Sequence, residues 1–67
     1  MKCVIKAFII YNKLEKTFWN ESEEECVHSL EEATRYNSKM TAEDEIKRFD
    51  FPDEFEVLPV EITLQTL

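Results

Sequence analysis

The sequence predicts a small α+β domain, with a three-stranded sheet in β-β-α-β order and one main helix packed on one face. Three segments carry this prediction: an apolar, β-branched stretch at 2–11, an alternating stretch at 55–64, and an amphipathic stretch at 42–49 between them. The 67 residues give room for one domain (1–67) with a modest core. Because 43% of the residues are hydrophobic and 12% are aromatic, we expect a folded chain rather than a disordered one.

The first strand is predicted over residues 2–11, whose sequence is KCVIKAFIIY. Both of its faces are largely apolar, which is typical of a central strand covered on both sides. The polar residues 12–16 form a connection of hairpin length into residues 17–20, which we expect to pair antiparallel with the first strand. Residues 26–28 are compatible with a further brief returning strand.

The helical region contains two start signals and one break. Ser29 and Glu32 fit a capping box, which predicts a helical turn there, and Thr41 offers a second start. A single helix over 30–49 is the alternative, but it would place Ile46 about 160° around the axis from Leu30 and create two opposed apolar stripes. We therefore predict a break near Asn37. Ala42, Ile46 and Phe49 would then form one stripe facing the sheet.

The last strand is predicted over residues 55–64, where Leu58, Val60, Ile62 and Leu64 alternate onto one face. Pro59 cannot donate to a strand ladder, so it indicates an edge strand or a bulge. A strand that follows a helix commonly returns parallel to its neighbour through a right-handed crossover. We therefore expect it beside the first strand and parallel to it.

The chain contains no glycine, which excludes the glycine-dependent loops that bind nucleotide phosphates. Turns that need a positive φ must be made by other residues. Asparagine and aspartate tolerate that conformation best, so we expect it at Asn12, Asn20, Asn37 or an aspartate.

The formal net charge is −7, from 8 basic and 15 acidic residues. This charge disfavours direct binding to nucleic acid or to an anionic membrane surface, because both depend on Lys and Arg. It favours a protein partner with a basic surface. The alternative is that the charge only keeps the protein soluble.

Neither a metal site, a cofactor site nor a catalytic residue is predicted. Cys3 and Cys26 lack the spacing of zinc ligands, and no export signal opens the chain, so we expect two free thiols and a cytoplasmic protein. Cys26 and His28 could lie on one strand face, but no oxyanion-stabilising loop accompanies them. We therefore expect a protein that is not an enzyme.

The residues predicted to bind a partner are Glu21, Glu23, Glu24, Glu25 and Trp19. The acidic run at 21–25 is too highly charged to be buried, so it is either a solvated loop or an acidic patch for a basic partner. Trp19 could anchor an interface, since tryptophan is enriched among binding hot spots. Its alternative role is to close a small core.

Four segments together resemble a layout found in small uncharacterised proteins of phages and prophages: Trp19-Asn20, Leu30–Tyr36, Ala42–Phe49 and Glu56–Ile62. The resemblance covers about two-thirds of the chain, and its motifs are structural, so no functional residue is transferred. It implies a phage-encoded accessory protein, a class that includes inhibitors of host defence and nucleic-acid mimics. The expected function is therefore non-enzymatic binding, and inhibition or modulation, of a protein in the host cytoplasm. The alternative is a small structural protein that assembles as a homo-oligomer.

Overall fold

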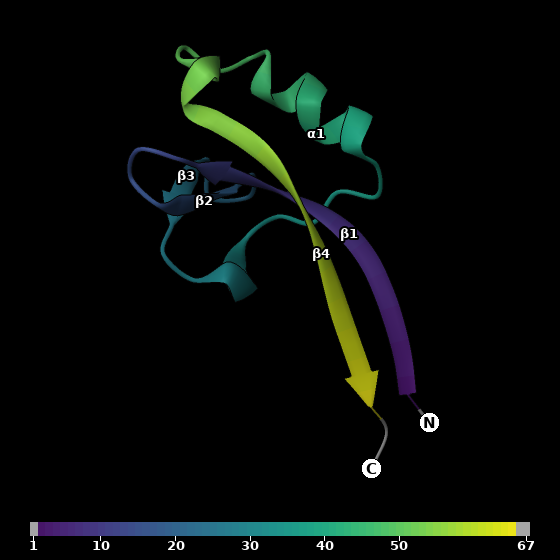
Figure 1. Ribbon diagram of the computed structural model, residues 1–67. Helices are drawn as coiled ribbons and strands as arrows, with labels where there is room; N and C mark the ends of the chain where they lie inside the picture. The colour runs from purple at the N-terminus through teal and green to yellow at the C-terminus, as the bar shows by residue number, and fades with distance from the viewer. Residues whose placement is uncertain (1, 66–67) are drawn as a thin grey trace.

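The computed structural model describes residues 2–65, which form an α+β fold with a four-stranded antiparallel sheet. The strands lie in the order β3-β2-β1-β4, and their bounds are β1 Lys2–Asn12, β2 Thr17–Asn20, β3 Glu25–Val27 and β4 Phe55–Gln65. One helix, α1 (Lys39–Ile46), packs on the sheet, and two short 3₁₀ turns, η1 (Leu30–Glu32) and η2 (Pro52–Glu54), flank it in sequence (Figure 1). The prediction of an α+β fold is confirmed. The prediction of three strands is wrong, because the brief segment after the acidic run does return as β3.

β1 and β4 pair along their whole length, from Lys2 opposite Gln65 to Asn12 opposite Phe55. The two predicted strands are therefore neighbours, and β1 is internal to the sheet as expected. Their relative direction was predicted wrongly, because they are antiparallel.

The length of α1 explains this antiparallel direction. The chain returns to the middle of β1 at Tyr36, which exchanges two backbone hydrogen bonds with Phe8, at 2.9 and 2.8 Å. From there, the eight residues of α1 cover only about 12 Å, at about 1.5 Å per residue. A parallel return would need a connection that spans most of an 11-residue strand. The helix instead delivers the chain to the end of β1, beside Asn12, and β4 runs back from there.

Pro59 sits where its missing N–H breaks no ladder bond. Both backbone polar groups of Phe8, its partner across the strands, are already bonded to Tyr36 on the other side of β1. The pair Phe8 and Pro59 is thus a non-hydrogen-bonded pair of the ladder, and the nitrogen of Pro59 lies on the outer edge of β4. The predicted edge strand is confirmed.

Each hairpin turn begins with an asparagine and ends in a left-handed residue. The Asn12 side-chain oxygen accepts from the backbone N–H groups of Leu14 and Glu15, both at 3.0 Å. Positive φ falls on Lys16 (57°) and Glu24 (52°), so the prediction that asparagine or aspartate would adopt it is wrong. The asparagines open the turns through side-chain hydrogen bonds instead.

The predicted break before α1 is confirmed, but the helix begins earlier than expected. Its N-cap is Ser38, whose hydroxyl accepts from the Thr41 N–H at 3.2 Å. The predicted capping box at Ser29 is wrong: η1 has no side-chain cap and lasts three residues. The segment that follows η1 bonds to the sheet instead of continuing a helix: the Thr34 N–H donates to the Trp19 carbonyl at 3.0 Å.

The core lies between α1 and the sheet. Ile10 and Ala42 are fully buried and Tyr36 is nearly so, and six partly buried side chains pack around them: Phe8, Trp19, Ile46, Phe49, Phe55 and Val57. Ala42, Ile46 and Phe49 therefore face the sheet as predicted. On the opposite sheet face, Leu30 of η1 lines a small depression together with Ile9 and Val60.

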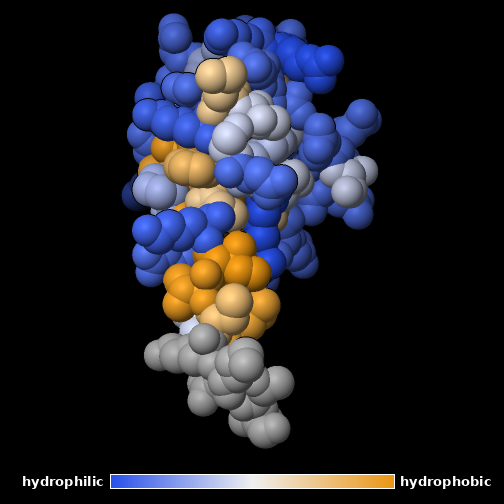
Figure 2. Space-filling model, turned by 90° about the vertical axis from the view of Figure 1, so that its right-hand side faces the viewer, coloured by the Kyte–Doolittle hydropathy of each residue, from blue (hydrophilic) through white to orange (hydrophobic). Residues whose placement is uncertain are grey.

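The far ends of β1 and β4 leave the core and project as a two-stranded ribbon, with residues 2 and 65, the ends of the described range, at its tip (Figure 1). Large apolar side chains remain exposed there, namely Val4, Ile5 and Leu64. Figure 2 shows a hydrophobic patch near the end of the ribbon, below a mostly hydrophilic surface.

Candidate functional site

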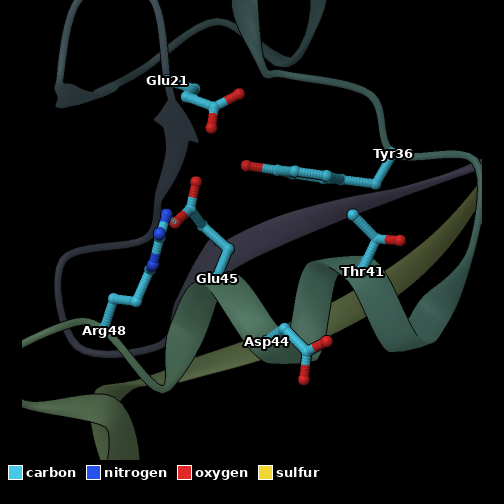
Figure 3. A pocket seen from close by; sticks show the side chains of 6 residues that line it. All are labelled: Glu21, Tyr36, Thr41, Asp44, Glu45 and Arg48. Atoms are coloured by element: carbon cyan, nitrogen blue, oxygen red, sulfur yellow. Dashed lines mark hydrogen bonds and ion pairs between the residues drawn. The ribbon is translucent and has the colours of Figure 1, made fainter.

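An open depression of about 360 Å³ lies between the β2–β3 turn and α1. We call it the acidic depression, and its lining residues are Glu21, Tyr36, Thr41, Asp44, Glu45 and Arg48 (Figure 3). Three of the six carry carboxylates and only one carries a cation. The depression is therefore negatively charged.

Glu21 is fixed in place by neutral side chains of the turn and of the segment that follows η1. Its backbone N–H donates to the Thr34 hydroxyl at 2.8 Å. The Asn20 side chain makes two further hydrogen bonds. Its oxygen accepts from the Glu23 N–H within the turn at 2.9 Å, and its amide donates to the Glu32 carbonyl of η1 at 2.6 Å. The turn thus has a defined shape that does not depend on its own carboxylates.

Glu45 lies on the last turn of α1, one residue before Ile46 in the core-facing stripe. Its side chain is only 12% exposed, and its carboxylate pairs with the Arg48 guanidinium at 3.4 Å. Arg48 itself is largely exposed. This ion pair is longer than the 2.7–2.9 Å that is typical of a strong charge-assisted hydrogen bond, so Glu45 is only partly compensated for its burial.

The carboxyl groups of Glu21 and Glu45 approach each other across the acidic depression (Figure 3). Hydrogen bonding between the protonated form and Glu45, together with the repulsion between the two negative charges, raises the pKa of Glu21 above its ordinary value, and the charge of Arg48 opposes this shift. Two residues that are far apart in sequence thus form one acidic pair.

Tyr36 lies beside this pair and is almost buried, at 7% exposure, and its hydroxyl has no hydrogen-bond partner among residues 2–65. Burial and the nearby carboxylates of Glu21 and Glu45 raise the pKa of Tyr36 to about 12. The nearby indole N–H of Trp19 acts in the opposite direction and lowers the pKa of Tyr36. The indole N–H and the phenol oxygen do not, however, meet the geometric criteria of a hydrogen bond to each other. The hydroxyl therefore stays protonated at neutral pH and is available as a donor.

The predicted partner-binding residues fall into two environments. Glu21, Glu23 and Glu24 lie in the exposed β2–β3 turn and Glu25 begins β3, also exposed. Trp19 is half buried, and its ring packs edge-on against Phe49, with 4.8 Å between the ring centroids. The structure therefore brings Trp19 into the core and leaves the four acids at the surface.

Sequence reasoning missed Tyr36, Asp44 and Glu45 as members of the site. Tyr36 stands next to the predicted break at Asn37, and a break of this kind frees the preceding residues to join a sheet. No pattern in the sequence indicates that a turn residue at 21 would meet a helix residue at 45. That contact follows from the path of the chain between them.

Within residues 2–65, no cluster of three or more His, Cys, Asp or Glu side chains is arranged to hold a metal ion. Cys3 and Cys26 are free thiols, the first exposed and the second half buried, and His28 is exposed. In the same part of the chain, no helix has the length and apolar character needed to cross a membrane.

The chain matches no protein-family model, and no curated protein or solved structure is significantly similar to it.

Proposed function

We propose that this protein is a non-enzymatic binding module that engages a protein partner with a basic surface. The observation that carries the proposal is the contact between Glu21 and Glu45, which joins the acidic β2–β3 turn to the acidic end of α1. Three carboxylates, those of Glu21, Asp44 and Glu45, are thereby grouped around one depression. A single solvated loop would not require this grouping.

Grouped carboxylates can occupy the positions at which a nucleic-acid-binding protein expects phosphates. The net charge of −7 on a chain of 67 residues gives a field that would steer such a partner toward this surface. Together with the resemblance to phage accessory proteins, these features favour an inhibitor or modulator of a basic protein in the cytoplasm of a host cell. In this proposal, Glu23, Glu24 and Glu25 extend the surface around Glu21.

The proposal is tested by replacing Glu21, Glu23, Glu24 and Glu25 together with Gln. Tagged wild-type and variant proteins serve as parallel baits in a host lysate, and the captured proteins are identified by mass spectrometry. We expect basic proteins that bind the wild type, leave it as salt is raised, and are depleted with the variant.

The association rate of each captured protein is then measured with both purified baits. The rate should be lower for the variant, and the difference should shrink at physiological salt, where charges are screened over about 8 Å. Equal association rates at low salt would reject the acidic surface as a binding site.

A homo-oligomer is the second candidate, and the exposed ribbon favours it. Val4, Ile5 and Leu64 are each at least 43% exposed at one end of the molecule. Contiguous apolar surface of several hundred Å² is typical of association sites. Pro59 interrupts the donors on the outer edge of β4, so self-association would use the faces of the ribbon rather than that edge.

Sedimentation equilibrium over a range of protein concentrations tests this second candidate. A dimer that becomes monomeric when Ile5 and Leu64 are both replaced by Thr would support it. A wild-type protein that stays monomeric throughout the range would reject it.

A further inference from the structure

The acidic pair at the depression lacks a sufficient counter-charge. Removing a carboxylate from water is costly unless a cation or several donors replace the lost hydration. The Glu45 side chain is only 12% exposed, and Arg48, its ion-pair partner within residues 2–65, lies at 3.4 Å with its own side chain 79% exposed. On its other side, Glu45 meets the carboxyl group of Glu21, which adds repulsion.

The Tyr36 hydroxyl gives a second and independent sign of an incomplete site. Tyr36 is 93% buried, the complement of its 7% exposure, and its hydroxyl has no partner. In Figure 3 the hydroxyl points into the space between Glu21 and Glu45. Buried polar groups in folded proteins nearly always have a partner, so an orphan that points into an open depression marks a place that a ligand can complete.

We propose that the acidic depression is a socket for the guanidinium group of an arginine on the basic partner. This inference rests on the function proposed above and identifies the residue that the partner inserts. The guanidinium would bridge the carboxylates of Glu21 and Glu45 from the solvent side. The positive charge would offset the repulsion between the two carboxylates. The Tyr36 hydroxyl would lie beside the bridged pair.

The geometry favours a guanidinium over a metal ion. A guanidinium is planar and has five donors, so it can bond two carboxylates at once. In the described part of the chain, the acidic residues do not converge as a metal-binding group of three. The volume of about 360 Å³ is also much larger than a bare ion needs and can admit the stem of a side chain. Arg48 already shows the chemistry, since it contacts Glu45 from the rim, and its exposure leaves it free to move aside.

The socket is tested by titrating the ¹⁵N-labelled full chain with N-acetyl-arginine methylamide at constant ionic strength. The matched control probe is N-acetyl-citrulline methylamide, which has nearly the same shape but no charge. We expect saturable shifts of the backbone amide signals of Glu21, Tyr36 and Glu45, with a dissociation constant in the millimolar range, from the arginine probe alone. Equal shifts from the citrulline probe, or shifts that do not saturate, would overturn the proposal.

Three variants separate a socket from a general acidic field. Glu21→Gln should weaken binding of the arginine probe roughly tenfold, and Tyr36→Phe roughly threefold, because each removes one group of the site. Glu31→Gln removes the same charge from the exposed η1 turn and should change the binding less than about twofold. If Glu31→Gln and Glu21→Gln weaken binding equally, the socket is refuted, while binding through a diffuse acidic surface still stands.

Two further outcomes distinguish the socket from the function on which it rests. If CaCl₂ causes the same shifts at lower concentrations than the arginine probe, the ligand is a metal ion and the guanidinium assignment is wrong. If the arginine probe saturates the socket while the Gln variant of the acidic turn leaves the association rate of every captured protein unchanged, the proposed function fails and the arginine site remains.

Discussion

Replacing Tyr36 with Phe should stabilise the protein at neutral pH. The substitution removes only the hydroxyl, which is buried without a hydrogen-bond partner, and keeps the ring that packs with Ile10 and Ala42. A buried polar group without a partner costs roughly 1–3 kcal/mol. Because the indole N–H of Trp19 is close enough to influence the oxygen, we take the lower end of that range and expect a gain of about 1 kcal/mol.

This gain is large enough to measure in a domain of this size. One kcal/mol corresponds to a rise of roughly 4–8 °C in Tm for a domain of 60–100 residues. Urea denaturation at pH 7, followed by the fluorescence of the single tryptophan, gives the free energy of unfolding directly. A Phe variant that is less stable than the wild type by about 0.5 kcal/mol or more would show that the hydroxyl has a partner in solution, and the reasoning would fail.

The difference between the two proteins should grow in alkali. The pKa of Tyr36 is raised in the folded state, from 10 to about 12, so ionisation of Tyr36 leaves the stability of the wild type unchanged below pH 10 and lowers it as the pH rises from 10 through 12. Each unit of pKa corresponds to about 1.4 kcal/mol, so about 1.4 kcal/mol should be lost by pH 11, and only from the wild type. Equal loss from both proteins between pH 9 and 11 would contradict the raised pKa.

Three further predictions concern the core, the turns and the thiols. Ile10→Ala should lower the free energy of unfolding by about 2–5 kcal/mol because Ile10 is fully buried. Ile46→Ala should lower it by only about 1–2 kcal/mol because Ile46 is partly exposed. Equal losses in urea denaturation would contradict this ranking. Lys16→Gly and Glu24→Gly should each raise the stability by about 0.5–1 kcal/mol, since both residues have positive φ, and a lower Tm for either variant would count against the turn geometry. Both thiols should react with a thiol reagent after denaturation without reductant, and in the folded state the exposed Cys3 should react faster than the half-buried Cys26; a pair that stays protected after denaturation would indicate a disulfide.

Periodicity was enough to predict which residues share a face. The alternation in 55–64 predicts that Leu58, Val60, Ile62 and Leu64 share one face of the strand. The helical spacing of Ala42, Ile46 and Phe49 gives the side of α1 that meets the sheet. These patterns depend on local geometry, which the sequence contains.

Direction and distant contacts could not be predicted in the same way. The antiparallel direction of β4 depends on where Tyr36 rejoins β1, and two backbone hydrogen bonds to Phe8 determine that position. Hydrogen bonds between backbone groups do not require particular side chains, so the sequence does not indicate where they form. The pairing of Glu21 with Glu45 depends in turn on this path, so charge patterning along the chain indicated an acidic surface but not its geometry.

The conformation of the β2–β3 turn does not depend on the side chains of Glu23 and Glu24. Its shape is held by the side chains of Asn20 and Thr34, which bond to backbone groups of the turn and of η1. No side-chain hydrogen bond or ion pair within residues 2–65 joins Glu23 or Glu24 to another group. Replacing these two residues by Gln therefore changes the charge without removing a structural contact, so a loss of binding in that double variant would report on recognition rather than on folding. Glu45 is different, because its mostly buried side chain lies against the core, and a change there would alter packing and charge together.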